Sequence, residues 1–224
     1  MKNPTFSICL PSRGRSEQLT KMIQSALKMA SDPRAVEFLI YVDFDDETMK
    51  KFHHPQAQLI VGQRKGISEM TNVAFSKSSG HILMYAADDI VFRTKGWDTL
   101  VQNAAKKTSS PVWLIHGTDL GQPITRIATH GFVSRPFADA LGYLLPPYFK
   151  ADFCDTWLTD VADMAGVRIS IASLEIEHVH PIWGKAKTDE TYQHRAETQN
   201  FWKEFVRYKL LYLRRRSAAK KITP

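Results

Sequence analysis

The pattern of apolar and polar positions along the chain predicts strands that alternate with helices. Nearly continuous apolar runs, which are typical of strands covered on both faces, occupy residues 6–10, 38–42, 59–61, 82–85, 90–92 and 112–116. Residues 174–180 instead alternate apolar and polar side chains, as a half-buried strand does. A strand, a helix and a second strand in succession favour a parallel sheet, so the pattern predicts an α/β fold.

Helical spacing of apolar residues lies between several of these runs. The clearest stripe follows Ser16, which we expect to cap the helix, and ends before Asp32-Pro33. Further helices are predicted over residues 68–78, from after Asp98 through Lys107, and from about residue 188 onward. The stripe of the first helix consists of Leu19, Met22, Ile23, Ala26 and Leu27.

Acidic residues follow two of the predicted strands. Asp88 and Asp89 come directly after the run at 82–85, and Asp43 ends the run at 38–42. Adjacent acids within apolar sequence are costly unless their charge is compensated, and at the carboxyl end of a strand in an open α/β sheet a ligand or its metal ion usually does so. The alternative is that these acids only cap turns.

A basic turn, Ser12-Arg13-Gly14-Arg15, joins the first strand to the first helix. Helix-terminal amides and arginines both favour anions, so this turn is a candidate phosphate or nucleotide site. It contains neither a Walker loop nor the GxGxxG pattern, which disfavours a nucleotide kinase or a Rossmann dehydrogenase.

Composition restricts the class of protein. The 224 residues are 43% hydrophobic and 24% charged, as in an ordinary globular domain, and the formal net charge of +7 favours polyanionic partners. Cys9 and Cys154 lie in apolar sequence and are interpreted as reduced core thiols. We find no signal peptide and no membrane-spanning run, and we expect a cytoplasmic protein.

Taken together, the ordered motifs resemble those of GT-A glycosyltransferases, most closely the inverting family 2. The resemblance covers about residues 5–185 and is carried by Pro11-Ser12-Arg13, Asp43, Gly66 to Asn72, Ser79-Gly80 and the acidic pair. It implies a GT-A fold, with a mixed, mainly parallel sheet flanked by helices. Ala86 replaces the first aspartate of the family's metal motif, which removes the residue that usually contacts the donor ribose.

The resemblance also implies roles for individual residues. The cation, Mn²⁺ or Mg²⁺, is expected on Asp88 and Asp89 together with one of two late histidines, His180 being favoured over His178. Donor-binding roles fall to Pro11, Ser12, Arg13, Arg15, Asp43, Arg64, Gly66, Asn72, Ala87, Asp88 and Lys185.

For the acceptor side, the resemblance places a catalytic base in an acidic motif at the start of a helix. Here Asp152 and Asp155 stand three apart, a spacing that shares one helical face. Asp152 is the favoured base and Asp155 the alternative, and one of the two is expected to be structural. His130 and Gly131 are the expected acceptor contacts.

The expected domain organisation is a catalytic domain over residues 1–187, with a nucleotide-binding half at about 1–92 and an acceptor half at about 93–187. Residues 188–224 form a basic amphipathic helix and tail. The aromatic face of this helix is expected to pack on the domain, and it consists of Phe201, Phe205, Tyr208 and Tyr212. The cations of the helix could contact DNA or an anionic membrane surface.

The sequence therefore favours a metal-dependent glycosyltransferase that moves a sugar from a nucleotide-sugar donor, with UDP preferred, to a hydroxyl of a glycan or of a modified base in DNA. One alternative is a nucleotidyltransferase-like enzyme, although the first turn lacks the lysine of such enzymes. The other is a non-catalytic nucleic-acid-binding module on the same fold.

Overall fold

The structure is a computed structural model that describes residues 5–198 and 200–223. Within these residues the strands form one eight-stranded mixed sheet, in the order β3-β2-β1-β4-β7-β6-β8-β5. The strands are β1 (Phe6–Ser12), β2 (Val36–Asp43), β3 (Ala57–Gly62), β4 (Ile82–Tyr85), β5 (Ile90–Phe92), β6 (Leu114–Thr118), β7 (Gly131–Ser134) and β8 (Arg168–His178).

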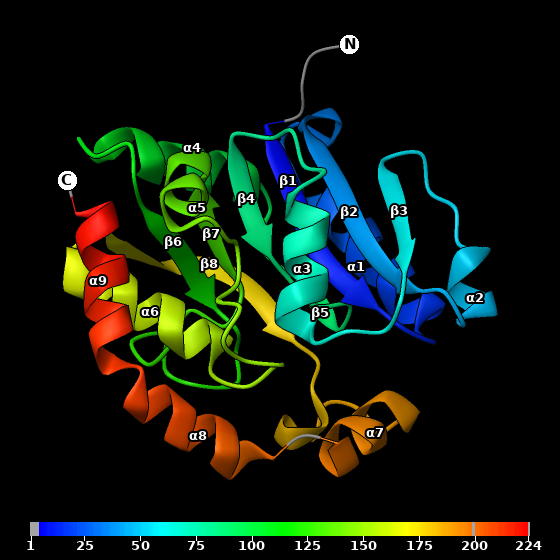
Figure 1. Cartoon of the computed structure of the whole chain (residues 1–224). Coiled ribbons are helices and arrows are strands. Elements are labelled where there is room, and N and C mark those ends of the chain that lie inside the picture. The colour runs from blue at the N-terminus through cyan, green and yellow to red at the C-terminus, as the bar shows by residue number, and fades with distance from the viewer. Residues whose placement is uncertain (1–4, 199, 224) are drawn as a thin grey trace.

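Helices cover both faces of this sheet (Figure 1). They are α1 (Ser16–Met29), α2 (Glu47–Lys50), α3 (Ile67–Phe75), α4 (Trp97–Lys107), α5 (Arg135–Leu141), α6 (Cys154–Ala165), α7 (Glu190–Thr198), α8 (Phe201–Leu210) and α9 (Tyr212–Ile222), with 3-10 turns η1 (Pro33–Ala35) and η2 (Pro181–Trp183). The predicted α/β architecture is therefore confirmed.

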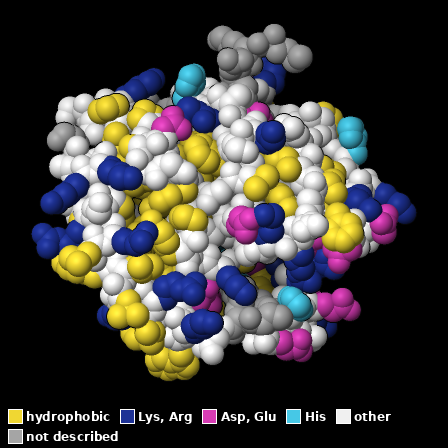
Figure 2. Space-filling view, viewed as in Figure 1, with side chains coloured by type: hydrophobic (Ala, Val, Ile, Leu, Met, Phe, Trp, Pro, Cys, Tyr) yellow, Lys and Arg dark blue, Asp and Glu magenta, His cyan; other side chains and the backbone are white. Residues whose placement is uncertain are grey.

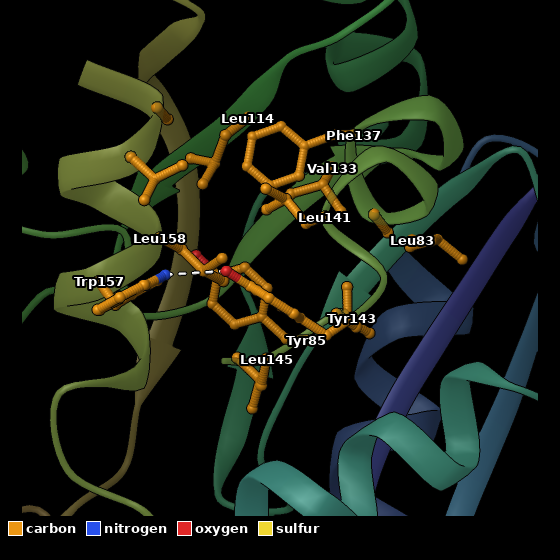
Figure 3. Close-up of a cluster of buried hydrophobic side chains, with 14 of the residues drawn as sticks. Leu83, Tyr85, Leu114, Val133, Phe137, Leu141, Tyr143, Leu145, Trp157 and Leu158 are labelled. Atoms are coloured by element: carbon orange, nitrogen blue, oxygen red, sulfur yellow. Dashed lines mark hydrogen bonds between the residues drawn. The ribbon is translucent and has the colours of Figure 1, made fainter. Parts of the chain in front are cut away.

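Two hydrophobic cores result from the alternation of side chains along the strands. In β1, Cys9 faces the core beneath α3, α5, α6 and α9, whereas Ile8 and Leu10 face the core beneath α1 and α4. Figure 3 shows part of the first core, in which the indole nitrogen of Trp157 donates a hydrogen bond of 3.0 Å to the hydroxyl of Tyr143. Cys9 and Cys154 are both buried and free, as expected.

The sheet is parallel from β3 to β4 and mixed further along, where β6 and β8 also pair parallel. β1, β2, β3 and β4 run parallel, with Ser12 paired to Val42 and Cys9 to Tyr85. β7 then runs antiparallel to β4 and β6, and β5 antiparallel to β8. Because the carboxyl ends of parallel strands meet at one edge, the turns that follow β1, β2 and β4 are brought together.

Several predicted boundaries were wrong in detail. Ser16 is the first residue of α1 and makes no capping bond, because the preceding Arg15 occupies the cap position. The strand predicted at 174–180 begins earlier, at Arg168, and ends at His178. The single helix predicted from about residue 188 is three helices, α7, α8 and α9.

The last helix is part of the first core. Ala218, Ala219 and Ile222 of α9 are buried against α5 and α6. Phe153 stacks on Tyr208 of α8 with ring centroids 5.3 Å apart. The expected packing of the aromatic face is thus confirmed for Tyr208 and for Phe205, which also contacts Phe153, whereas Phe201 and Tyr212 are 52% and 48% exposed.

Candidate functional site

A large cleft opens at the carboxyl edge of the parallel strands. Its volume is about 860 Å³, which is within the usual range for small-molecule sites. Residues from the first half of the chain, from Pro11 to Asp89, and from the second half, from Asp119 to Trp183, both contribute to it, and so does α7. The predicted site residues that line it are Pro11, Ser12, Arg13, Arg15, Asp43, Arg64, Gly66, Ala87, Asp88, Asp89, His130, Asp155, His178 and His180.

Asp88 is held by the turn that follows β1. Its two carboxylate oxygens accept hydrogen bonds from the hydroxyl of Ser12, at 2.7 Å, and from Nη1 of Arg15, at 3.0 Å. Burial, with the nearby Asp89 charge, raises the pKa of Asp88 to about 6, although Arg15 opposes this shift. Both carboxylate oxygens of Asp88 are therefore used in holding the turn that carries Ser12 and Arg15.

Asp89 faces a different set of partners. Its Oδ2 lies 3.3 Å from Nε2 of His178, and one ligand atom from each of Asp89, His178 and His180 falls within 4.8 Å of the others. Burial would raise the pKa of Asp89, but the His178 hydrogen bond and charge hold it well below its usual range. The carboxylate is thus ionised and oriented toward the two imidazoles.

The group of Asp89, His178 and His180 fits a divalent cation. Carboxylate oxygen and imidazole nitrogen are ordinary ligands for Mn²⁺, and Oδ1 of Asp89 is buried without a hydrogen-bond partner among the described residues. Such an orphaned acceptor is costly unless a cation or donor reaches it. The sequence predicted Asp88 and Asp89 with one of the two histidines, His180 being favoured. The structure instead groups Asp89 with both histidines and leaves Asp88 out of the group.

Asp189 and Tyr192, near the start of α7, also reach the site, and the sequence analysis did not identify them. Asp189 accepts two hydrogen bonds from Arg15, at 2.7 and 2.8 Å. The Arg15 guanidinium lies 4.1 Å from the centre of the Tyr192 ring, and the Tyr192 hydroxyl donates a hydrogen bond to Asp89. Both residues stand in a polar segment without a motif, so only the fold could find them.

His130 is a buried, neutral histidine at the base of the site. It is 8% exposed, and burial lowers its pKa to about 3. Its ring lies 4.7 Å from that of His178, edge to face, and its Nε2 has no hydrogen-bond partner among the described residues. His130 thus presents an unsatisfied nitrogen beside the candidate ligands.

Asp43 forms the other acidic part of the cleft. It is 3% exposed and accepts a hydrogen bond of 3.0 Å from Nη1 of Arg13, while Nε of Arg64 lies 3.8 Å away. Its Oδ1 is buried with no partner among the residues described. This free acceptor, flanked by two arginines, suits a hydroxyl or N–H donor on a ligand that also carries negative charge.

The two candidate bases occupy different places. Asp155 lies in the first turn of α6 and lines the cleft, where its Oδ1 accepts a hydrogen bond of 2.7 Å from the backbone of Thr156. Asp152 precedes the helix and does not line the cleft. The expectation that both share one helical face was wrong, because Phe153, with a φ of 66°, ends the loop between them.

Three other predicted contacts do not line the cleft. Asn72 holds the backbone of Leu144 and Leu145. Lys185 pairs with Glu177 at 2.9 Å. Gly131 lies in β7, where an added Cβ would stand 2.4 Å from the hydroxyl of Tyr85, so its role in the fold is to admit that side chain.

The fold is that of GT-A glycosyltransferases. A crystal structure of S. aureus TarS 1-349 matches at a TM-score of 0.58 and 17% identity, over 77% of this chain and 59% of that one. The same fragment with UDP-GlcNAc matches at 0.58 and 17%, over 85% and 64%. The mannosyltransferase PcManGT from Pyrobaculum calidifontis, in complex with GDP-Man and Mn²⁺, matches at 0.61 and 13%, over 80% and 58%.

These likenesses confirm the expected fold. No protein-family model matches the chain, and no curated protein matches its sequence. The chain spans 58% of the length of the mannosyltransferase and 59% of the first TarS fragment. Across the described residues, every helix is too short or too polar to cross a lipid bilayer.

Proposed function

We propose that this chain is a metal-dependent glycosyltransferase that uses a nucleotide-sugar donor. The observation that carries the proposal is the meeting, in one cleft of a GT-A fold, of Asp43 with the ligand group of Asp89, His178 and His180. Such a cleft provides separate places for a nucleoside and for a diphosphate. Similar solved structures bind UDP-GlcNAc and, with Mn²⁺, GDP-Man, which supports this class of donor.

The nucleoside would bind between Asp43 and the arginines beside it. Oδ1 of Asp43 is free to accept a hydrogen bond from a base N–H or a ribose hydroxyl. Arg13 and Arg64, which pair with Asp43 at 3.0 and 3.8 Å, add positive charge that would attract the phosphates of the donor. A UDP-sugar is the preferred donor, since the TarS fragment binds UDP and UDP-GlcNAc.

Asp89, His178 and His180 would hold the cation. When bound, a divalent cation stabilises the negative charge that develops on a departing diphosphate. Before the cation binds, Nε2 of His178 lies 3.3 Å from Oδ2 of Asp89, and the low pKa of Asp89 keeps that oxygen unprotonated for binding. Mn²⁺ is preferred to Mg²⁺, because imidazole ligands suit Mn²⁺ better than Mg²⁺.

Asp155 is the proposed general base, in place of Asp152. A carboxylate oxygen of Asp155 would take the proton of the acceptor hydroxyl, while the oxygen of that hydroxyl forms a bond to the anomeric carbon. The bond from this carbon to the diphosphate oxygen breaks, and the electron pair leaves with the nucleoside diphosphate. Attack from the side opposite the leaving group inverts the anomeric centre, and the acceptor would be a glycan or a modified base in DNA.

The test is donor hydrolysis and transfer across a panel of UDP-, GDP-, CMP- and TDP-sugars with Mn²⁺. We expect release of nucleoside diphosphate from one donor class, at least 100-fold slower in His178→Ala and in Asp155→Asn (about 3 kcal/mol of barrier). Asp139→Asn, on the exposed surface of α5, should retain full activity. No turnover of any donor, combined with salt-dependent DNA binding, would instead support the non-catalytic alternative.

A further inference from the structure

Helices α8 and α9 expose a stripe of large apolar side chains. Trp202, Leu210 and Leu213 are 70%, 78% and 74% exposed, and Val206 is also exposed. These four residues follow one another at spacings of four, four and three, which places them along one side of the helical segment. Few soluble surfaces present leucine and tryptophan in a continuous row, so the stripe indicates a binding surface.

The opposite side of the same helices is fixed to the domain, so this exposure does not reflect a detached segment. The buried carboxylate of Glu204 accepts hydrogen bonds from the backbone amides of Lys150, at 2.6 Å, and Asp152, at 2.8 Å. In α9, the buried Arg215 lies with its guanidinium 3.9 Å from the centre of the Tyr208 ring. The apolar stripe is therefore held outward by a rigid attachment.

Positive charge surrounds this stripe. Residues 201–223 contain eight of the 30 Lys and Arg residues of the chain but only one of its 23 Asp and Glu residues, the buried Glu204. The segment thus accounts for the whole formal excess of seven positive charges, and the remainder of the chain is balanced. Figure 2 shows hydrophobic and basic side chains side by side where Figure 1 places α8 and α9. The exposed cations are Lys203, Arg207, Lys209, Arg214, Arg216, Lys220 and Lys221.

We propose that α8 and α9 dock the protein on an anionic lipid surface, with Trp202, Leu210 and Leu213 inserted at the level of the headgroups. An apolar stripe bordered by Lys and Arg is the arrangement that binds such surfaces, because burial of apolar area and attraction to acidic lipids add together. A nucleic acid would use the cations but leave the leucines in water. A second copy of the chain would bring two surfaces of the same sign together.

Docking by α8 and α9 would also bring the cleft close to the lipid surface. Glu204 of α8 is bonded to the backbone of Lys150, and Lys150 lines the cleft. The acceptor side of the cleft therefore lies next to the docked helices. The inference does not depend on sugar transfer, because vesicle binding can be measured without donor or acceptor.

The test is co-sedimentation of the full chain with vesicles of phosphatidylcholine alone and of phosphatidylcholine with 30% phosphatidylglycerol, in buffer at about 0.15 M salt. We expect binding to the acidic vesicles at least tenfold tighter than to the neutral ones. Leu210→Gln with Leu213→Gln should weaken that binding about tenfold or more, since two leucine side chains would no longer be buried in the lipid. Lys203→Gln, Arg216→Gln and Lys220→Gln together should weaken it by a similar factor.

Matched controls carry the same chemical changes elsewhere. Val61→Gln with Met164→Gln alters two exposed apolar residues, and Lys21→Gln, Lys106→Gln and Lys107→Gln remove three exposed cations outside the segment. These variants should bind acidic vesicles as the parent does, and circular dichroism should show that all variants are folded.

Three results would overturn the proposal. The first is equal, weak binding to both kinds of vesicle. The second is binding to a random-sequence DNA duplex that is lost with the cations but unaffected by the two leucine substitutions, while acidic vesicles do not compete. The third is a dimer in sedimentation equilibrium that Leu210→Gln with Leu213→Gln dissociates, which would assign the stripe to a second copy of the chain.

Discussion

The hydroxyl of Tyr192 donates a hydrogen bond to Oδ2 of Asp89, the same carboxylate oxygen that lies 3.3 Å from Nε2 of His178. A residue of α7 thus occupies one acceptor position on the proposed metal ligand. This contact joins the last part of the chain to the edge of the sheet. Burial of the hydroxyl and the negative charge of Asp89 both raise the pKa of Tyr192 far above its usual value.

Tyr192→Phe is therefore expected to strengthen metal binding. A hydrogen bond of this kind contributes about 0.5–1.5 kcal/mol, so its loss should lower the dissociation constant for Mn²⁺ about two- to tenfold. Isothermal titration calorimetry would measure this change. Tyr212→Phe, which alters an exposed tyrosine of α9, is the control, and weaker binding in Tyr192→Phe would show that the hydroxyl supports the site instead.

Arg15 is expected to be a major contributor to stability. It is 6% exposed and bridges Asp88 and Asp189, so Arg15→Ala leaves a buried carboxylate without its partner. The free energy of unfolding should fall by about 3 kcal/mol, measured by urea denaturation. Arg34→Ala removes an arginine whose side chain is 93% exposed and should change stability by less than about 0.5 kcal/mol. Equal effects of the two substitutions would contradict this assignment.

Gly131→Ala should destabilise the protein by overpacking. The added methyl group would meet the Tyr85 hydroxyl at 2.4 Å, and we expect a loss of about 1–3 kcal/mol. Tyr85→Phe removes that hydroxyl, so a double-mutant cycle should show that the two substitutions together cost less than the sum of each alone. Strict additivity would mean that the ring of residue 85, whose Cζ and Cε1 lie 2.8 and 3.0 Å from the added Cβ, limits the space at residue 131 and not the hydroxyl.

Asp119 is expected to make stability depend on acid pH. Burial would raise its pKa, but hydrogen bonds from the backbone of Gly121 and from Thr129 and Gln122 lower it below the usual value. The ionised form is therefore favoured by folding, and its contribution is present above pH ~4 and lost as pH falls further. In Asp119→Asn, the free energy of unfolding should decrease less between about pH 5 and pH 3 than in the parent protein. The same slope in both would contradict the assignment.

The sequence placed several candidate residues correctly because strand ends can be recognised locally. An apolar run followed by acids puts those acids at the end of a strand, and the parallel register then brings Asp43 and Asp88 to the same edge. It could not distinguish Asp88 from Asp89. Their difference depends on Arg15 and His178, which approach from segments 73 and 89 residues away along the chain.

Other assignments also depended on distant contacts. Asn72 reads as a polar residue in a donor motif, but its amide is used by the backbone of Leu144 and Leu145. Asp152 and Asp155 have helical spacing, yet a positive φ at Phe153 delays the helix until Cys154. A local pattern cannot show either fact, because one needs a remote partner and the other a backbone conformation that is rare for phenylalanine.

By itself, the sequence determined the α/β alternation, the strand that carries the acidic pair, the two late histidines and the excess positive charge of residues 201–223, since each of these is written in local order and composition. Only the tertiary structure decided that Asp89, not Asp88, meets His178 and His180, that Asp189 and Tyr192 close onto Arg15, and that Leu210 and Leu213 face outward. The reason is physical: burial, pairing and exposure depend on which distant segments pack together, and that is a property of the whole folded chain.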